Sequence, residues 1–416
     1  MVPQRLGAQS VPPLSALGRI RISRTALFVA SIPFTLLMVL AIDALVGLMK
    51  PPDTSLVFAR HSTFSYSTPE FRTEVRINNL GFRGDDVDLR QRKRYRVIAL
   101  GDSFTFGWGV DVEESWPKVL ESELRRQGLD VEVLNLGAPG AFPAEYADIA
   151  RLALPLLRPD LVVVAVHHAD DLGQTMRAEA AAAGRSWPRA AWSAGRAALK
   201  WTYPNLAALR RRAASVAPAE REATTTWKRE VAEVLSRSSP EQAAKFRRMD
   251  DTVKNMFVNG ELNPAQLIFG LWRPDEIRNT LDLDQPLVGL GIRAMGDQLV
   301  KIRHSADGVG GRVVVLSLPN GLFVSRAMQE SYARIGVTVQ AEDLATTKMD
   351  EAVRMAAARA GVEFLGVTDR FREASKTRSL FFEFDGHYNR EGHRFFAACI
   401  EAFIRSRLTA KVRAAA

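Results

Sequence analysis

Five short apolar runs, interleaved with segments of helical periodicity, constrain the fold of this chain more than any other feature of its sequence. The runs are Tyr95 to Leu100, Val131 to Leu136, Leu161 to Val166, Arg312 to Leu318 and Val362 to Leu365. Helices are predicted at Glu114 to Gln127, Pro143 to Leu157, Ala294 to Ser305, Glu342 to Ala360 and Arg390 to Arg405. Apolar runs without polar alternation are typical of parallel strands covered on both faces. We therefore expect an α/β fold with a doubly wound, flavodoxin-like, five-stranded parallel sheet.

A long segment without strand signals separates the third and fourth predicted strands. It spans about residues 173–290, is rich in Ala, Arg and Glu, and carries Trp187, Trp192, Trp201, Trp227 and Trp272. We predict a helical insertion, which is either a cap over a site at the sheet edge or a decoration that packs by its tryptophans. The halves of the sheet domain are then 95–172 and 291–408, with a linker and N-terminal extension at 50–94 and a tail at 409–416.

The amino-terminal region predicts a membrane anchor. Residues 25–49 are predicted as the anchor, and the almost uninterruptedly apolar segment Ala26 to Met49 is about 36 Å long as a helix, enough for a bilayer core. Arg19, Arg21 and Arg24 precede them at the end of a predicted cytoplasmic tail, residues 1–24, and only Lys50 follows closely. The positive-inside rule then predicts one span of the cytoplasmic membrane, with the sheet domain on the periplasmic or extracellular side. An uncleaved anchor is favoured over a signal peptide. Asp43 lies either at the outer interface or against another membrane helix.

Composition narrows the class of protein. The 416 residues are 47% apolar and 25% charged, as in globular proteins. The net charge of +9 comes mainly from dispersed arginine rather than from a basic block interleaved with aromatic residues. We therefore expect no nucleic-acid partner. A single cysteine, Cys399, precludes an internal disulfide.

The turn after the first predicted strand carries a candidate nucleophile. Gly101-Asp102-Ser103-Phe104-Thr105-Phe106-Gly107 separates that strand from a helix. At such a turn the Ser103 hydroxyl is exposed at the carboxyl edge of the sheet, and its outward N–H favours developing negative charge. These are the requirements of a nucleophile, although the tripeptide Gly-Asp-Ser alone is equally consistent with a plain turn.

A base and a carboxylate follow the last predicted strand. Phe384-Asp385-Gly386-His387-Tyr388-Asn389 precedes a helix, and residues two apart can face the same way. An imidazole can accept the serine proton at neutral pH, and Asp385 can fix its tautomer. His393 is interpreted as a packing or capping residue, and no role is expected for His61 or His304.

These motifs together resemble the SGNH (GDSL-type) hydrolase superfamily. Besides the serine turn and Asp385-Gly386-His387, the segment Asn135-Leu136-Gly137-Ala138-Pro139-Gly140 looks like the family's glycine block. Asn78 to Gly84, by composition only a loop, is similar to a stretch upstream in membrane-anchored bacterial members. The resemblance covers residues 78–172 and about 291–405. It implies Ser103 as nucleophile, His387 as base and Asp385 as orienting group, with the Ser103 and Gly137 N–H groups as oxyanion donors.

The sequence departs from the family pattern at two places. Aspartate and histidine of the last block are two rather than three residues apart. In the third block, where the family has an asparagine that donates to the oxyanion, His167-His168-Ala169-Asp170-Asp171 places Asp170. An ionised Asp170 would repel the oxyanion. Three explanations remain open: Asp170 is protonated and donates, His168 donates instead, or the protein is a weak or inactive relative.

Two classes of function follow from this resemblance. One is a serine esterase or O-acyltransferase that acts on acyl groups, foremost acetyl, of cell-envelope or exported polysaccharide, with a lipid ester as second substrate class. The other is a catalytically weak or inactive member that binds glycan or assists polysaccharide assembly. Aromatic residues near the motifs could stack on sugar rings: Phe104, Phe106, Trp108, Phe142, Phe384 and Tyr388. No cofactor or metal is expected. A metal-dependent phosphoesterase built on Asp102, Asp170, Asp171 and His387 lacks a ligand-spaced motif.

Overall fold

The computed structural model describes residues 31, 34–35, 37–45, 57–183 and 223–413. The chain divides into two units. One comprises Met1–Asp53 with Trp192–Arg211, and the other comprises Thr54–Ala191 with Arg212–Ala416. In the first unit the described residues between 31 and 45 are helical. Within the described ranges no helix combines the length and apolarity that a membrane crossing requires. The remainder of the predicted anchor lies outside them.

The second unit is built on a five-stranded parallel sheet. Its strands are β3 (Tyr95–Gly101), β4 (Val131–Gly137), β5 (Leu161–Val166), β6 (Arg312–Ser317) and β7 (Glu363–Leu365). They lie in the order β4-β3-β5-β6-β7, and every neighbouring pair is parallel. The predicted flavodoxin-like sheet is therefore confirmed. The strand order reverses between β3 and β5, which places a ligand crevice beyond the carboxyl ends of these strands.

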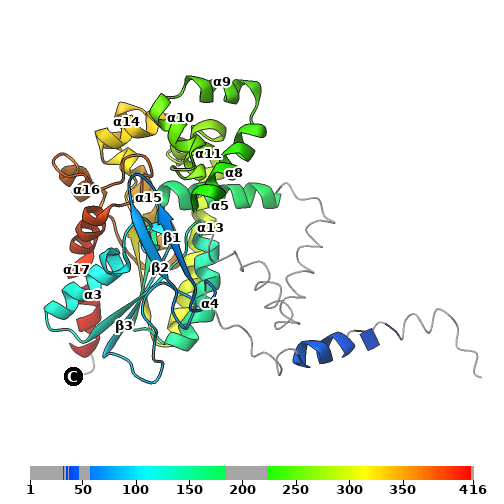
Figure 1. Ribbon diagram of the computed structural model, residues 1–416. Helices are drawn as coiled ribbons and strands as arrows, with labels where there is room; N and C mark the ends of the chain where they lie inside the picture. Colours follow the sequence, from blue (N-terminus) through cyan, green and yellow to red (C-terminus); the bar gives the residue numbers. More distant parts are fainter. Residues whose placement is uncertain (1–30, 32–33, 36, 46–56, 184–222, 414–416) are drawn as a thin grey trace, which may run out of the picture. The chain divides into compact units, whose positions relative to one another are not determined.

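Helices cover both faces of the sheet, as Figure 1 shows. One face is packed by α3 (Trp116–Arg126) and α17 (Arg390–Arg413), whose apolar residues form one core cluster with Val97, Val133 and Val163. The other face is packed by α4 (Pro143–Leu157), α13 (Pro286–Asp307) and α15 (Lys348–Ala360). Burial of the strands on both sides explains why most of their positions are apolar. The shorter helices are α14 (Arg326–Ile335) and α16 (Thr368–Ala374), with 3-10 turns η2 (Val112–Glu114), η3 (Gly321–Phe323) and η4 (Ala341–Ala345).

The interpretation of residues 50–94 as a linker needs correction. The segment contains an antiparallel hairpin of β1 (Thr63–Ser67) and β2 (Arg72–Arg76). In β2 the second and fourth positions are buried and the others are exposed. The two strands were not predicted because each has only five residues, and their buried positions include polar side chains such as Thr73.

All the secondary-structure elements in the described part of the insertion are helices. After α5 (His168–Ala183) it continues with α8 (Ala223–Ser236), α9 (Pro240–Arg248), α10 (Asp251–Val258), α11 (Pro264–Trp272) and α12 (Glu276–Asn279). Figure 1 shows α8 to α11 gathered at one end of this unit, beside α14. Trp227 packs among Tyr66, Phe71 and Trp108. Three of the five tryptophans, Trp187, Trp192 and Trp201, lie outside the described residues.

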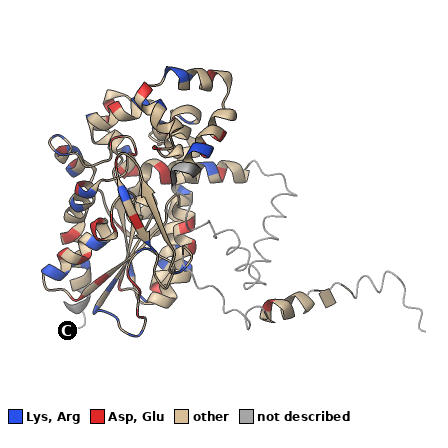
Figure 2. Cartoon of the chain, viewed as in Figure 1, with Lys and Arg blue, Asp and Glu red and all other residues tan. Residues whose placement is uncertain are grey.

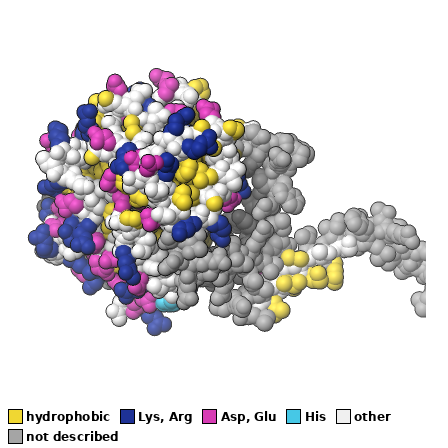
Figure 3. All heavy atoms as spheres, turned by 45° about the horizontal axis from the view of Figure 1, so that its top comes forward, with side chains coloured by type: hydrophobic (Ala, Val, Ile, Leu, Met, Phe, Trp, Pro, Cys, Tyr) yellow, Lys and Arg dark blue, Asp and Glu magenta, His cyan; other side chains and the backbone are white. Residues whose placement is uncertain are grey.

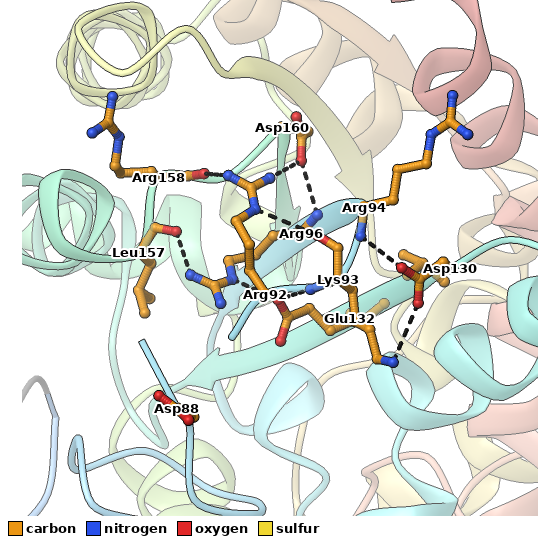
Figure 4. A network of polar contacts seen from close by, with 12 residues as sticks. Asp88, Arg92, Lys93, Arg94, Arg96, Asp130, Glu132, Leu157, Arg158 and Asp160 are labelled. Atoms are coloured by element: carbon orange, nitrogen blue, oxygen red, sulfur yellow. Dashed lines mark hydrogen bonds and ion pairs between the residues drawn. The ribbon is translucent and has the colours of Figure 1, made fainter. Parts of the chain in front are cut away.

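A basic run at the amino end of β3 is paired with carboxylates, as Figure 4 shows. Three ion pairs join neighbouring elements here: Arg92 with Asp160, Lys93 with Asp130, and Arg96 with Glu132. Acidic and basic residues are distributed along the whole second unit in Figure 2 and are interspersed on the face seen in Figure 3. The basic run lies at the amino edge of the sheet, opposite the edge that carries Ser103.

Candidate active site

Ser103 begins α2 (Ser103–Phe106), a single helical turn directly after β3. The Asp102 side chain caps this turn by accepting a hydrogen bond from the Phe104 N–H at 2.9 Å. Gly107 ends the turn in the left-handed region, with φ 85°. The sequence therefore forms a tight strand-to-helix connection with the Ser103 hydroxyl at the carboxyl edge of the sheet.

Two glycines allow this turn to lie against the sheet. A Cβ on Gly101 would lie 2.1 Å from Thr105 Oγ1, and a Cβ on Gly137 would lie 2.2 Å from the Phe106 nitrogen. Both distances are impossible for a real side chain. Gly101 and Gly137 are partners in the β3–β4 register. Because neither has a side chain, the turn that carries Ser103, here called the nucleophile turn, can pack on the ends of both strands.

The structure brings Ser103, His387 and Asp385 together, the residues predicted as nucleophile, base and orienting carboxylate. Ser103 Oγ lies 2.7 Å from His387 Nε2, and His387 Nδ1 lies 2.5 Å from Asp385 Oδ1. The second carboxylate oxygen, Oδ2, accepts a hydrogen bond from Trp108 Nε1 at 3.2 Å. A neutral imidazole with its hydrogen on Nδ1 satisfies both contacts and leaves Nε2 to accept the serine proton.

The electrostatic surroundings raise the pKa of His387. Burial is the largest single cause and lowers the pKa, but the charge and hydrogen bond of Asp385, together with the charges of Asp102 and Asp170, outweigh burial. The raised pKa means that the imidazolium formed when Ser103 loses its proton is stabilised by negative charge. The arrangement can therefore perform general base catalysis of attack by a hydroxyl group.

The structure corrects the assignment of Gly137 as an oxyanion donor. Its N–H donates to the Asn135 side-chain oxygen at 2.9 Å and is already used. Gly140, three residues later, lines the cavity beside Ser103 and adopts φ 75°. Among the described residues, none accepts a hydrogen bond from the Gly140 N–H. The backbone conformation of the turn sets the direction of each N–H group. The sequence motif alone therefore did not show which of the two glycines has an N–H available to an oxyanion.

Asp170 lies where the resemblance placed it, in the wall of the cavity. Its Oδ2 accepts a hydrogen bond from Gln174 Nε2 at 2.8 Å, and burial raises its pKa. Asp171 points away into the core, where it accepts hydrogen bonds from the Tyr146 hydroxyl and from the His167 N–H. Burial raises the pKa of Asp171 well above its ordinary value.

His168 does not replace Asp170 as a donor. Its ring is fully buried, packs against Phe323 and lies 3.9 Å from Asp350 rather than in the cavity. Burial lowers the pKa of His168 well below its ordinary value. The neighbouring His167 faces the cavity instead, between Asp102 and Asn320. The predicted capping role of His393 is confirmed, because its Nδ1 accepts a hydrogen bond from the Trp116 N–H.

The cavity at Ser103 has a volume of about 310 Å³. The insertion contributes part of its wall, which favours the interpretation of the insertion as a cap: Asn263, Ala265, Gln266, Phe269 and Ile277. Of the aromatic residues proposed to stack on sugars, Phe104 and Trp108 line the cavity. Phe106 and Tyr388 are buried in the core, and Phe384 is buried beneath Arg334.

Several polar residues of the site were missed by sequence reasoning. Asn320 lines the cavity from the turn directly after β6, and its amide donates to the Tyr332 hydroxyl at 3.1 Å. The rule that ligands bind beyond the carboxyl ends of parallel strands could have identified Asn320. No local signal identified Tyr332 on α14 or Gln266 on α11, because tertiary packing brings them there.

Arg83, in the stretch interpreted as a loop, was also missed. Its side chain is 1% exposed, and its guanidinium donates to the carbonyl oxygens of Phe106, Gly107 and Val110. Burial lowers the pKa of Arg83 to about 10. The upstream segment therefore holds the end of the nucleophile turn with a buried cation.

In the parts of the chain that the structure describes, no group of three or more His, Cys, Asp or Glu side chains could hold a metal ion. Of the four residues of the phosphoesterase hypothesis, Asp171 accepts a hydrogen bond from the Tyr146 hydroxyl in the core.

Comparisons with known proteins agree with the sequence resemblance. Residues 99–256 match the model of the GDSL-like Lipase/Acylhydrolase family. An arylesterase of Vibrio mimicus is 32% identical over 81 residues, which are 18% of this chain and 38% of that protein. The chain thus matches well under half the length of this curated relative.

Some solved structures resemble this chain distantly. A lipase/acylhydrolase from Enterococcus faecalis aligns with a TM-score of 0.37 at 10% identity, over 75% of this chain and 96% of its own. An acetylxylan esterase from Geobacillus stearothermophilus aligns with a TM-score of 0.36 at 11% identity, over 76% and 95%. The family match covers residues 99–256, which include Ser103 and its turn but end before Asp385 and His387.

Proposed function

We propose that this protein is a serine esterase or O-acyltransferase that acts on short acyl esters, foremost acetyl, of cell-envelope or exported polysaccharide. The observation that carries the proposal is the contact of Ser103 Oγ with His387 Nε2 at 2.7 Å, with Asp385 2.5 Å behind the imidazole. A hydroxyl, a base and an orienting carboxylate in one line are the parts that acyl transfer through a covalent intermediate requires.

The reaction would proceed in two halves. Ser103 Oγ attacks the ester carbonyl while His387 takes the serine proton, and the tetrahedral oxyanion accepts hydrogen bonds from the Ser103 and Gly140 N–H groups. His387 then protonates the leaving alcohol as the ester bond breaks, which leaves an acyl-enzyme. Water or a sugar hydroxyl, deprotonated by His387, releases the acyl group and restores Ser103.

Asp170 can serve as a third donor when it is protonated. Gln174 engages one of its carboxyl oxygens, and burial raises its pKa, which favours the acid form. A protonated carboxyl group donates one hydrogen bond, as the amide of an asparagine would at this position.

The size and lining of the cavity support a small, hydroxylated substrate over a long lipid chain. A volume of about 310 Å³ is at the lower end of the usual range for small-molecule sites. The wall combines the polar residues Asn320, Gln266 and Tyr332 with the aromatic residues Phe104 and Trp108. Aromatic faces pack on the apolar faces of sugar rings, and the polar groups can bond their hydroxyls.

We further propose that residues 25–49 anchor the protein in the cytoplasmic membrane, so that its substrate is an envelope or exported glycan. The support is the apolar length of this segment and the arginines that precede it. Protease protection of spheroplasts tests the topology. Digestion of the sheet domain by external protease is expected, and complete protection of that domain would contradict the proposal.

The activity is tested with the full-length protein, a fluorophosphonate probe and a short-chain nitrophenyl ester. We expect covalent labelling and ester hydrolysis, both lost in Ser103→Ala. Addition of an oligosaccharide acceptor separates transferase from esterase, because only a transferase forms acylated sugar at the expense of free acid.

A catalytically weak or inactive glycan-binding protein is the second candidate. The observation in its favour is Asp170, a carboxyl group in the cavity where the family has a neutral donor. Absence of Ser103 labelling, together with retained binding of an acetylated oligosaccharide, would establish this alternative instead of the enzyme.

A further inference from the structure

Each polar group of Asp385 has a different partner, and three of the four partners lie in other segments of the chain. Its Oδ1 contacts His387, and its Oδ2 accepts from Trp108 Nε1. Its backbone carbonyl accepts from Gln266 Nε2 at 2.6 Å, and its N–H donates to Glu70 Oε2 at 2.8 Å. Of these partners, Glu70 is the one that lies in the amino-terminal hairpin, outside the sheet and the insertion.

Glu70 binds the loop of Asp385 at two points. One carboxylate oxygen accepts from the Phe384 N–H at 3.0 Å, and the other accepts from the Asp385 N–H. Hydrogen bonds from backbone N–H groups to an ionised carboxylate are stronger than bonds between neutral groups. Two of them on consecutive residues define both the position and the direction of the backbone that carries Asp385.

The same hairpin holds the indole that binds Asp385. The ring centroid of Tyr66 lies 4.4 Å from that of Trp108, and the Phe71 ring packs against Trp108 from its edge. The hairpin therefore determines two of the four contacts of Asp385, one directly through Glu70 and one through Trp108.

The ionised form of Glu70 is destabilised at this position. Burial raises the pKa of Glu70, and the negative charge of Asp385 raises it further, while the N–H groups of residues 383–385 lower it. If residue 70 only filled space, a neutral side chain would be more stable there, because two carboxylates close together repel. The Glu70 carboxylate instead fixes the geometry of the loop through its hydrogen bonds to the Phe384 and Asp385 N–H groups.

We propose that Glu70 is a positioning residue for catalysis: it holds the Asp385 backbone so that Asp385 meets His387 at hydrogen-bond distance. The proposal rests on the serine-esterase function proposed above. The amino-terminal hairpin, which sequence analysis interpreted as a linker, is on this view part of the catalytic apparatus.

The test compares Glu70→Gln with Glu74→Gln in the full-length protein. Glu74 lies on β2 of the same hairpin and its side chain is 64% exposed, so its substitution is a matched control. Glutamine keeps one acceptor oxygen but presents an N–H₂ group to the second N–H donor. We expect kcat to fall about 10- to 100-fold, since displacements of about 1 Å have such effects, while KM changes less than about threefold.

A pH profile distinguishes positioning from a general loss of folded protein. The groups that face His387 are Asp385, Asp102 and Asp170, and Asp385 raises its pKa most. A loosened Asp385 raises that pKa less, so the acid limb of kcat/KM is expected to move to lower pH in Glu70→Gln and to stay in Glu74→Gln. If Glu70→Gln does not fold, Glu70→Asp, which shortens the reach of the carboxylate, is measured by the same criteria.

The outcomes separate this proposal from the function on which it rests. An inactive, unlabelled wild-type protein refutes the esterase function. An active wild type with unchanged kcat in the Glu70 variant refutes positioning by Glu70. Loss of kcat with an unmoved acid limb indicates a purely structural contact, and a moved limb with unchanged kcat indicates a charge effect only. Either result overturns the proposal.

Discussion

Replacement of Asp170 by asparagine tests the unusual feature of this site. In the wild type, Gln174 Nε2 donates to Asp170 Oδ2 at 2.8 Å. In Asp170→Asn the side-chain oxygen can keep this hydrogen bond, and the amide nitrogen with its hydrogens replaces the other carboxylate oxygen. An ionised Asp170 would repel the oxyanion: two unit charges about 4 Å apart at an effective dielectric of about 20 interact by about 4 kcal/mol. That energy corresponds to about a thousandfold in rate.

The sign of the pH dependence follows from the raised pKa of Asp170. Below that pKa the carboxyl group is protonated, carries no charge and donates like an amide, so wild type and variant are expected to react at similar rates. Above it the wild type carries the repelling charge and lacks the donor. The ratio of kcat/KM in Asp170→Asn to that in wild type should therefore rise with pH, from near one to between about tenfold and a thousandfold.

Hydrolysis of a short-chain ester, followed by pH-stat titration across the range in which the protein stays folded, measures this ratio. Asp148→Asn is the matched control, because Asp148 is 75% exposed on α4 and its substitution should give a ratio of one throughout. A loss of more than about tenfold in Asp170→Asn at every pH would refute the reasoning and give the ionised aspartate a role of its own. A ratio independent of pH would also contradict it.

Two further predictions address the nucleophile turn and the base. Gly137→Ala places a Cβ 2.2 Å from the Phe106 nitrogen, so it should destabilise the fold by about 1–3 kcal/mol in thermal unfolding. Gly289→Ala, inside helix α13, should have no effect or stabilise it, and equal effects of both would contradict the close-packing argument. Asp385→Asn should lower kcat about 10⁴-fold, as loss of the orienting aspartate does in a serine protease. A loss below tenfold in steady-state assays would show that His387 does not depend on this carboxylate.

Local signals determined the framework of the sheet. The strands around the nucleophile turn were predicted to within about one residue, because a strand buried on both faces is mostly apolar. The convergence of Ser103 and His387 was also predictable, since the carboxyl ends of parallel strands share one edge whatever separates them in sequence. Hairpin strands β1 and β2 carried no comparable signal, as they are short and half polar.

The tertiary structure alone decided how the site is held together. Whether Gly137 or Gly140 presents a free N–H depends on the backbone direction within one turn, which residue identity does not encode. Asp385 is held by Glu70 and Gln266, which lie 315 and 119 residues earlier in the chain. Such contacts leave no periodicity in the sequence, because each consists of one side chain reaching a backbone group that the fold has brought within hydrogen-bond distance.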